Sequence, residues 1–238
     1  MKADRTLLIV ALVLVPILSA GAAYVSVDRS DDFSPGSIKT VAFLPFARVG
    51  PPPGYPQAKC PLAGESFNSC KMEDAAEAEL SRKIGQALLG SGAPVVWTPQ
   101  SEINRVRKEL KEEGNIQLDL SGSWQKAIAK ELGVDAVMFG FVYCYRDRSG
   151  TWWASAEPAA IGFCLHLLDP DTGDVLWSYR YEDRQQALSE NLLNLPRFIK
   201  RGGKWITIET MAEEGANSVI AALPWNRPVD KKEDPAEK

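Results

Sequence analysis

Apolar residues recur along the chain with two different spacings, which distinguish strands from helices. Runs rich in β-branched and aromatic residues predict strands. These runs cover 39–46, 94–97, 134–145, 159–168 and 174–182. Apolar residues spaced three or four positions apart predict amphipathic helices. These stretches cover 74–90, 98–114, 121–133 and 207–223.

The resulting order, β-α-β-α-α-β-β-β-α, predicts an α/β (mixed α+β) fold. Helices separate the early strands, so these strands should run parallel through right-handed crossovers and form one mixed sheet. The last three strands follow one another closely and should form an antiparallel meander. Residues 169–173 (DPDTG) have the composition of a tight turn between two of them. The helices would then pack on the sheet.

The amino-terminus carries an export leader, in which Lys2 and Arg5 precede an apolar run from Thr6 to Val27. Two interpretations stay open. Residues 20–22 (AGA) fit a cleavage site, which would leave a mature chain beginning near Ala23. A run of about 20 apolar residues can equally cross a bilayer uncleaved. Both place the rest outside the cytoplasm, so we expect a periplasmic protein, soluble or anchored to the inner membrane by residues 6–27.

The rest of the chain should form a single domain, preceded by a linker and followed by a disordered tail. Polar residues 28–38 read as a linker, and residues 39–224 as the domain. Several prolines within 48–70 predict a long loop without regular structure. Residues 225–238 are charged and contain proline, which predicts a disordered tail.

Charge and histidine content exclude some functions. A net charge of -4 argues against a general nucleic-acid binder, which should be basic. The single histidine, His166, cannot supply a histidine cluster for zinc or acid–base chemistry. It alternates with leucines on a predicted strand, and we interpret it as half-buried at the sheet surface. We expect no catalytic residue, cofactor or metal; a hydrolase using His166 with Asp169 is a lesser alternative.

Four cysteines in an exported chain indicate disulfides. Cys60 and Cys70 flank one short loop, so we predict that they pair, with a stabilisation of about 3 kcal/mol in the chain-entropy model. Cys144 and Cys164 lie on consecutive predicted strands, where a bridge is sterically possible and two buried free thiols are the alternative. The spacings contain no C-x-x-C pair, which argues against zinc.

Two surface features suggest contacts with other molecules. Trp152 and Trp153 lie in a predicted connection between strands, where adjacent aromatic rings suit partner docking, a membrane interface or sugar stacking. A basic cluster could meet phosphate headgroups or an acidic partner surface, and a solvated loop is the alternative. This cluster comprises Arg197, Lys200, Arg201 and Lys204.

Several segments resemble envelope lipoproteins related to the curli-secretion channel subunit. These segments are VAFLPF (41–46), GVDAVMFGFV (133–142), AAIGFCLHLLDPDTGDVLWS (159–178) and DRQQ (183–186). The Tol-Pal translocation protein amino-terminal domain and lipoprotein activators of penicillin-binding proteins are similar in fold. The chain departs from these lipoproteins at Gly21, where they carry the lipidated cysteine. The shared motifs mark strands and turns and identify no catalytic site.

The leader and the resemblance together suggest a working hypothesis. We expect a non-enzymatic domain that binds envelope proteins in a transport, secretion or wall-synthesis complex, with a homo-oligomer among the forms it could take. Contact with the membrane would occur through the amino-terminal segment if it is uncleaved. A glycan- or lipid-binding module that uses Trp152 and Trp153 is the alternative hypothesis.

Overall fold

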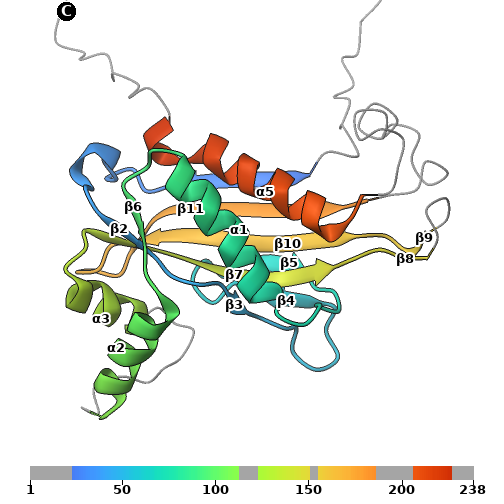
Figure 1. Cartoon of the computed structure of the whole chain (residues 1–238), viewed down its shortest axis with the longest axis horizontal. Helices are drawn as coiled ribbons and strands as arrows, with labels where there is room; N and C mark the ends of the chain where they lie inside the picture. Colours follow the sequence, from blue (N-terminus) through green and yellow to red (C-terminus); the bar gives the residue numbers. More distant parts are fainter. Residues whose placement is uncertain (1–22, 113–122, 151–154, 186–205, 227–238) are drawn as a thin grey trace, which may run out of the picture.

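The computed structural model describes residues 23–112, 123–150, 155–185 and 206–226. A seven-stranded mixed sheet lies at its centre (Figure 1). The sheet order is β1 (Tyr24–Arg29), β11 (Val175–Arg184), β10 (Ala160–Leu168), β7 (Ala136–Arg146), β2 (Val41–Phe43) and β6 (Val95–Trp97), with β3 (Ala47–Arg48) pairing β7 beyond β2. A small ribbon of β8 (Ser149–Gly150) and β9 (Ser155–Glu157) extends the β7–β10 hairpin.

Strand directions follow the predicted pattern. β2 runs parallel to both β6 and β7, whereas β7, β10 and β11 form an antiparallel meander. The long strand β7 is apolar on both sides and lies at the centre of the sheet, as expected for a strand covered on both faces. The mixed α/β fold class predicted from the order of elements is therefore confirmed.

Helices cover both faces of the sheet. On one face, α1 (Ala76–Gly90) and α5 (Ile208–Ala222) lie side by side (Figure 1). The opposite face is covered by α2 (Gln100–Glu112), α3 (Ser123–Leu132) and a hairpin of β4 (Gln57–Lys59) and β5 (Ser66–Asn68). Because side chains alternate along a strand, β10 sends Phe163 and Leu165 to the α1–α5 core and Cys164 to the other core.

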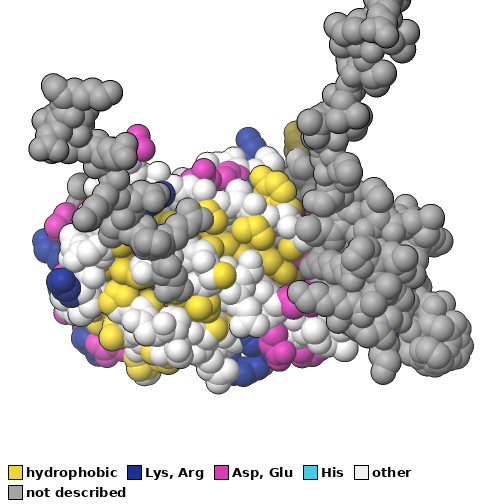
Figure 2. Space-filling view, turned by 90° about the horizontal axis from the view of Figure 1, so that it is seen from above, with side chains coloured by type: hydrophobic (Ala, Val, Ile, Leu, Met, Phe, Trp, Pro, Cys, Tyr) yellow, Lys and Arg dark blue, Asp and Glu magenta, His cyan; other side chains and the backbone are white. Residues whose placement is uncertain are grey.

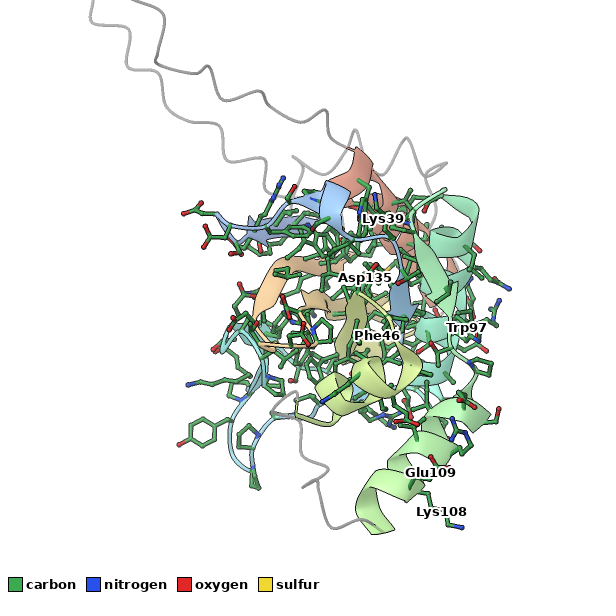
Figure 3. The ribbon with its side chains drawn as sticks, turned by 90° about the vertical axis from the view of Figure 1, so that its left-hand side faces the viewer. Lys39, Phe46, Trp97, Lys108, Glu109 and Asp135 are labelled. Atoms are coloured by element: carbon green, nitrogen blue, oxygen red, sulfur yellow. A yellow bond between two sulfur atoms is a disulfide. The ribbon has the colours of Figure 1, made fainter. Side chains whose placement is uncertain are left out.

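Asp135 joins the starts of the two parallel strands β2 and β7. Its Oδ2 atom accepts hydrogen bonds from the backbone N–H groups of Lys39 at 2.8 Å and Thr40 at 2.9 Å. Figure 3 shows Asp135 below Lys39 at this end of the sheet. These donors stabilise the ionised carboxylate and hold the pKa of Asp135 below its ordinary value.

The predicted linker at 28–38 is wrong, because this segment packs on the domain. Residues 24–29 form β1, which pairs with β11 over its whole length. Phe33 and Ile38 are buried, and the short helix η1 (Pro35–Ser37) lies between them. The indole N–H of Trp225, within η3 (Pro224–Asn226), donates to the carbonyl of Pro35. The segment is thus held on the domain by strand pairing with the edge of β11 and by burial of its apolar side chains.

The predicted irregular loop at 48–70 is also wrong in part, since it contains the β4–β5 hairpin. The prolines precede the hairpin or lie in its turn, where they remove no ladder hydrogen bond. Ala58 and Phe67 face inward and are fully buried against the sheet. Two inward side chains therefore anchor a segment whose sequence is dominated by turn residues.

Most of the predicted leader and most of the predicted tail lie outside the described residues, at 1–22 and 227–238. The predicted end of the leader at Val27 is wrong, because Tyr24–Val27 belong to β1 in the sheet. Within the described part of the chain, no helix combines the length and apolar character needed to span a bilayer.

Candidate functional site

The disulfide of this chain joins Cys70, just after β5, to Cys144 in β7. Cys60 and Cys164 are free and buried. The predicted pair Cys60–Cys70 is therefore wrong, and so is the possible bridge between Cys144 and Cys164. The alternative of two buried free thiols holds for Cys164 and fails for Cys144. In the β7–β10 register, Cys144 lies opposite Gly162 and Cys164 lies opposite Phe141, so the two are not cross-strand neighbours. The side chain of Cys60 is buried in the core, with its Sγ atom 3.6 Å from that of Cys164.

Cys60 and Cys164 instead belong to a buried thiol–imidazole cluster, which we define as Cys60, Tyr143, Cys164, His166 and Ser178. The two Sγ atoms lie 3.6 Å apart, and His166 Nε2 lies 3.2 Å from Cys60 Sγ and 3.0 Å from Cys164 Sγ. Tyr143 Oη lies 3.2 Å from Cys164 Sγ, and His166 Nδ1 lies 3.0 Å from Ser178 Oγ. Three separate parts of the chain meet in this cluster: the β4–β5 turn, β7, and the β10–β11 pair.

The fold positions each member of the cluster. Cys164 and His166 are two residues apart on β10, so their side chains share a face. Ser178 lies directly opposite His166 on β11. Tyr143 projects from the neighbouring strand β7 with its ring stacked on Phe67 of the hairpin at 3.9 Å. The hairpin thereby brings Cys60 over the sheet.

Burial and hydrogen bonding separate the acidities of the two thiols. The hydrogen bond with Cys164 holds the pKa of Cys60 well below its ordinary value, against the opposing effect of burial, and His166 acts in the same direction. Burial raises the pKa of Cys164, and the neighbouring Cys60 adds to this effect. Cys60 is therefore the thiol that ionises first.

His166 is fully buried, so the predicted half-buried position at the sheet surface is wrong. Figure 2 accordingly shows no histidine on the face seen from above, where apolar side chains gather across the middle and charged side chains lie mainly toward the rim. Asp169 belongs to the β10–β11 turn, where its Oδ1 accepts the N–H groups of Asp171 and Thr172. The Asp169 carboxylate thus accepts hydrogen bonds within the predicted turn, whereas the polar neighbours of the His166 ring are the two thiols and Ser178.

A second feature is an open groove of about 530 Å³ beside the disulfide. Its walls come from β1, β7, β10, β11 and the end of the hairpin. Three arginines line it: Arg146, Arg180 and Arg184. Arg180 forms an ion pair with Glu182, which also lines the groove, and lies 4.2 Å above the ring of Phe67. Tyr24 borders the groove at the start of β1, and the guanidinium of Arg180 lies 5.0 Å from its ring centre.

The surface residues predicted from sequence lie outside the described part of the chain. These are Trp152, Trp153, Arg197, Lys200, Arg201 and Lys204. The predictions for the aromatic pair and the basic cluster therefore stay predictions. The groove arginines form no motif in the sequence, and no spacing along the chain links His166 to Cys60. The pattern Cys164-x-His166 on a predicted strand was the available signal, because residues two apart on a strand share a face.

The sequence matches no protein-family model and no curated protein. Among solved structures, PelC in a dodecamer from Paraburkholderia phytofirmans is similar, with 12% identity, a TM-score of 0.47, and coverage of 84% of this chain and 96% of that chain. The LpoB C-terminal domain from Salmonella enterica has 14% identity and a TM-score of 0.38, with 66% of this chain and 88% of that chain covered.

Lipoprotein GNA1162 from Neisseria meningitidis has 14% identity and a TM-score of 0.37, with 69% of this chain and 96% of that chain covered. Identities and TM-scores this low do not decide what this chain binds. Its resemblance to the curli-secretion and Tol-Pal proteins stays a prediction from sequence.

Proposed function

We propose that this chain is an exported, non-enzymatic domain that binds another protein of the cell envelope through the groove and the adjacent edge strand β1. The observation that carries the proposal is the position of the arginine-lined groove beside that edge. Within the described residues β1 pairs with β11 alone, so its outer N–H and C=O groups are available to an added strand.

The chemistry of this surface defines the partner it fits. Three arginines against Glu182 and Asp183 make the groove lining cationic, although the whole chain carries a net charge of -4. Tyr24 and Val25 expose 55% and 42% of their surface on the edge strand. An extended segment with acidic side chains would add to β1 through main-chain hydrogen bonds and place a carboxylate against the arginines.

The oxidising compartment indicated by the disulfide and the burial of the single histidine both support a binding function outside the cytoplasm. A disulfide behind an export leader fits an oxidising compartment such as the periplasm. The chain has one histidine, and its ring is enclosed by the thiols and Ser178 instead of facing the groove. Binding is therefore better supported than acid–base or nucleophilic catalysis at this surface.

Site-specific crosslinking in the bacterial envelope tests the proposal. The full chain with its leader would carry a photoreactive residue in place of Tyr24. We expect a defined adduct that Arg184→Glu weakens strongly, whereas Arg82→Glu leaves it unchanged. Arg82 is a matched control because it is exposed on α1, and no residue of α1 lines the groove.

Mass spectrometry of the adduct identifies the partner, and light scattering of the purified chain shows whether the partner is a second copy. An adduct that forms equally in both charge-reversal variants would contradict docking at the groove. The absence of any adduct from position 24, with the protein exported and folded, would contradict the proposed function.

A further inference from the structure

We propose that the thiol–imidazole cluster is a buried Zn²⁺ site, with Cys60 Sγ, Cys164 Sγ and His166 Nε2 as its protein ligands. This inference is independent of the proposed docking function. It rests on the positions of these three atoms, on their burial, and on the groups that surround them.

The three donor atoms have the spacing of ligands around one metal ion. They form a triangle with sides of 3.6, 3.2 and 3.0 Å. An ion about 2.2 Å from each atom, a distance typical of zinc bound to sulfur and nitrogen, would lie about 1.1 Å out of their plane. Three ligands of a tetrahedral ion at this bond length would lie about 3.6 Å apart, with the ion about 0.7 Å out of their plane. The two sulfurs already have this spacing, and His166 Nε2 would move outward by about half an ångström to reach it.

The surrounding groups orient the donors as ligands. Ser178 Oγ lies 3.0 Å from His166 Nδ1, and a proton on Nδ1 donated to this oxygen leaves the Nε2 lone pair directed at the two sulfurs. The backbone N–H of Ala63 donates to Cys60 Sγ at 3.4 Å, and the Tyr143 hydroxyl is placed to donate to Cys164 Sγ at 3.2 Å. Donors aimed at sulfur stabilise thiolates, the form that binds metal.

Charge balance selects a divalent ion. Two thiolates and a neutral imidazole around Zn²⁺ give a complex with no net charge, whereas Cu⁺ with the same ligands would leave one negative charge. Cys164 and His166 are fully buried and Cys60 is 2% exposed, so an uncompensated charge would be costly here. Arg180, on the strand beside Cys164, is already paired with Glu182 and Glu65. Thiolate and imidazole ligands are the types that zinc prefers.

The site would fix the hairpin to the sheet. Cys60 follows β4, whereas Cys164 and His166 belong to β10. The disulfide fixes the other end of the same segment, since Cys70 follows β5 and is bonded to β7. Coordination also accounts for two thiols that stay unbonded 3.6 Å apart in a chain that forms another disulfide.

The test is metal analysis of the full chain, expressed with its leader and purified without chelators. We expect one zinc per chain, lost in Cys60→Ser, Cys164→Ser and His166→Ala. Ser178→Ala should keep the fold and lower zinc affinity about 10- to 100-fold, as is usual when the partner of a ligating histidine is removed. Ser218→Ala is the matched control, because it also removes a side-chain hydrogen bond, from Tyr179, outside the cluster; its zinc content should equal that of the wild type.

A spectroscopic probe keeps the test independent of variant stability. Co²⁺ added to the reduced, zinc-free wild-type chain should give a thiolate-to-cobalt charge-transfer band, and added Zn²⁺ should abolish it. The proposal is overturned if neither ion binds the reduced protein, or if binding survives in all three ligand variants. It is equally overturned if peptide mapping of the native protein finds Cys60 and Cys164 joined as a disulfide.

Discussion

Loss of the Cys70–Cys144 bond should lower the free energy of unfolding by about 4 kcal/mol. The bond links residues separated by 74 positions, and a loop of that length removes this much free energy from the unfolded state in the chain-entropy model. The bond predicted from sequence, between Cys60 and Cys70, would close a much shorter loop and contribute about 3 kcal/mol in the same model.

The assay is urea unfolding of the wild type and of a Cys70→Ser/Cys144→Ser double variant, followed by far-ultraviolet circular dichroism. Wild-type protein treated with a non-chelating reductant provides the control, because it loses the bond but keeps both side chains. Both samples should lose a similar amount of stability relative to the oxidised wild type. A difference below about 1 kcal/mol in the reduced wild type would refute the entropic argument for this loop.

The pairing itself can be read from a tryptic digest made without reduction. Cys60 and Cys70 lie on one peptide, residues 60–71, and Cys144 lies on residues 131–146. The bond in the structure predicts that these two peptides are joined, with Cys60 reactive toward a thiol reagent after unfolding. A peptide 60–71 closed on itself would support the Cys60–Cys70 pair instead.

Three further substitutions test the packing of the sheet. Gly140→Ala should cost about 1–3 kcal/mol in urea unfolding, because its methyl group would lie 2.6 Å from the backbone oxygen of Cys164. Ser81→Ala should cost about 1–3 kcal/mol, since it leaves a buried backbone N–H without its acceptor, whereas exposed Ser37→Ala should change stability by less than about 0.5 kcal/mol. Asp135→Asn should lower the urea midpoint at neutral pH. Because the pKa of Asp135 is lowered in the folded state, its ionised carboxylate stabilises the fold above the ordinary pKa of 3.8, and this stabilisation is lost as the pH falls through the folded pKa. The difference in urea midpoint between the variant and the wild type should therefore shrink as the pH falls below 3.8. A difference independent of pH would contradict this explanation.

Much of the central fold could be predicted because its elements carry strong and continuous signals. The apolar run at 134–145 became β7, whose two covered faces leave no polar alternation. The helix predicted to start after Thr207 does so, and its apolar side packs against the sheet. In contrast, the apolar run that ends at Val27 predicts a leader up to that residue, whereas Tyr24–Arg29 form β1, because an apolar leader and an edge strand can have similar compositions.

The candidate site was harder to predict, because it depends on long-range placement. The short hairpin strands β4 and β5 each contain one inward residue, which is too little for a periodic pattern. The spacing of two cysteines along the chain determines the entropic cost of closing the loop between them, and this cost favours the nearby pair Cys60–Cys70. The spacing does not show in which direction each side chain points, which decides the pairing in the folded chain. The contact of Cys60 with His166 spans 106 positions and exists only once the hairpin has folded over β10.

The order of the cysteines has a consequence for biogenesis. Synthesis proceeds from the amino-terminus, so Cys60 and Cys70 are both available before Cys144 exists. These two thiols also meet most readily, since the cost of ring closure grows with loop length. An early bond between them has to be undone by thiol–disulfide exchange before Cys70 can reach its final partner. If that early bond forms, maturation of this chain requires isomerisation, whereas a ligand bound to Cys60 would keep this thiol from being oxidised.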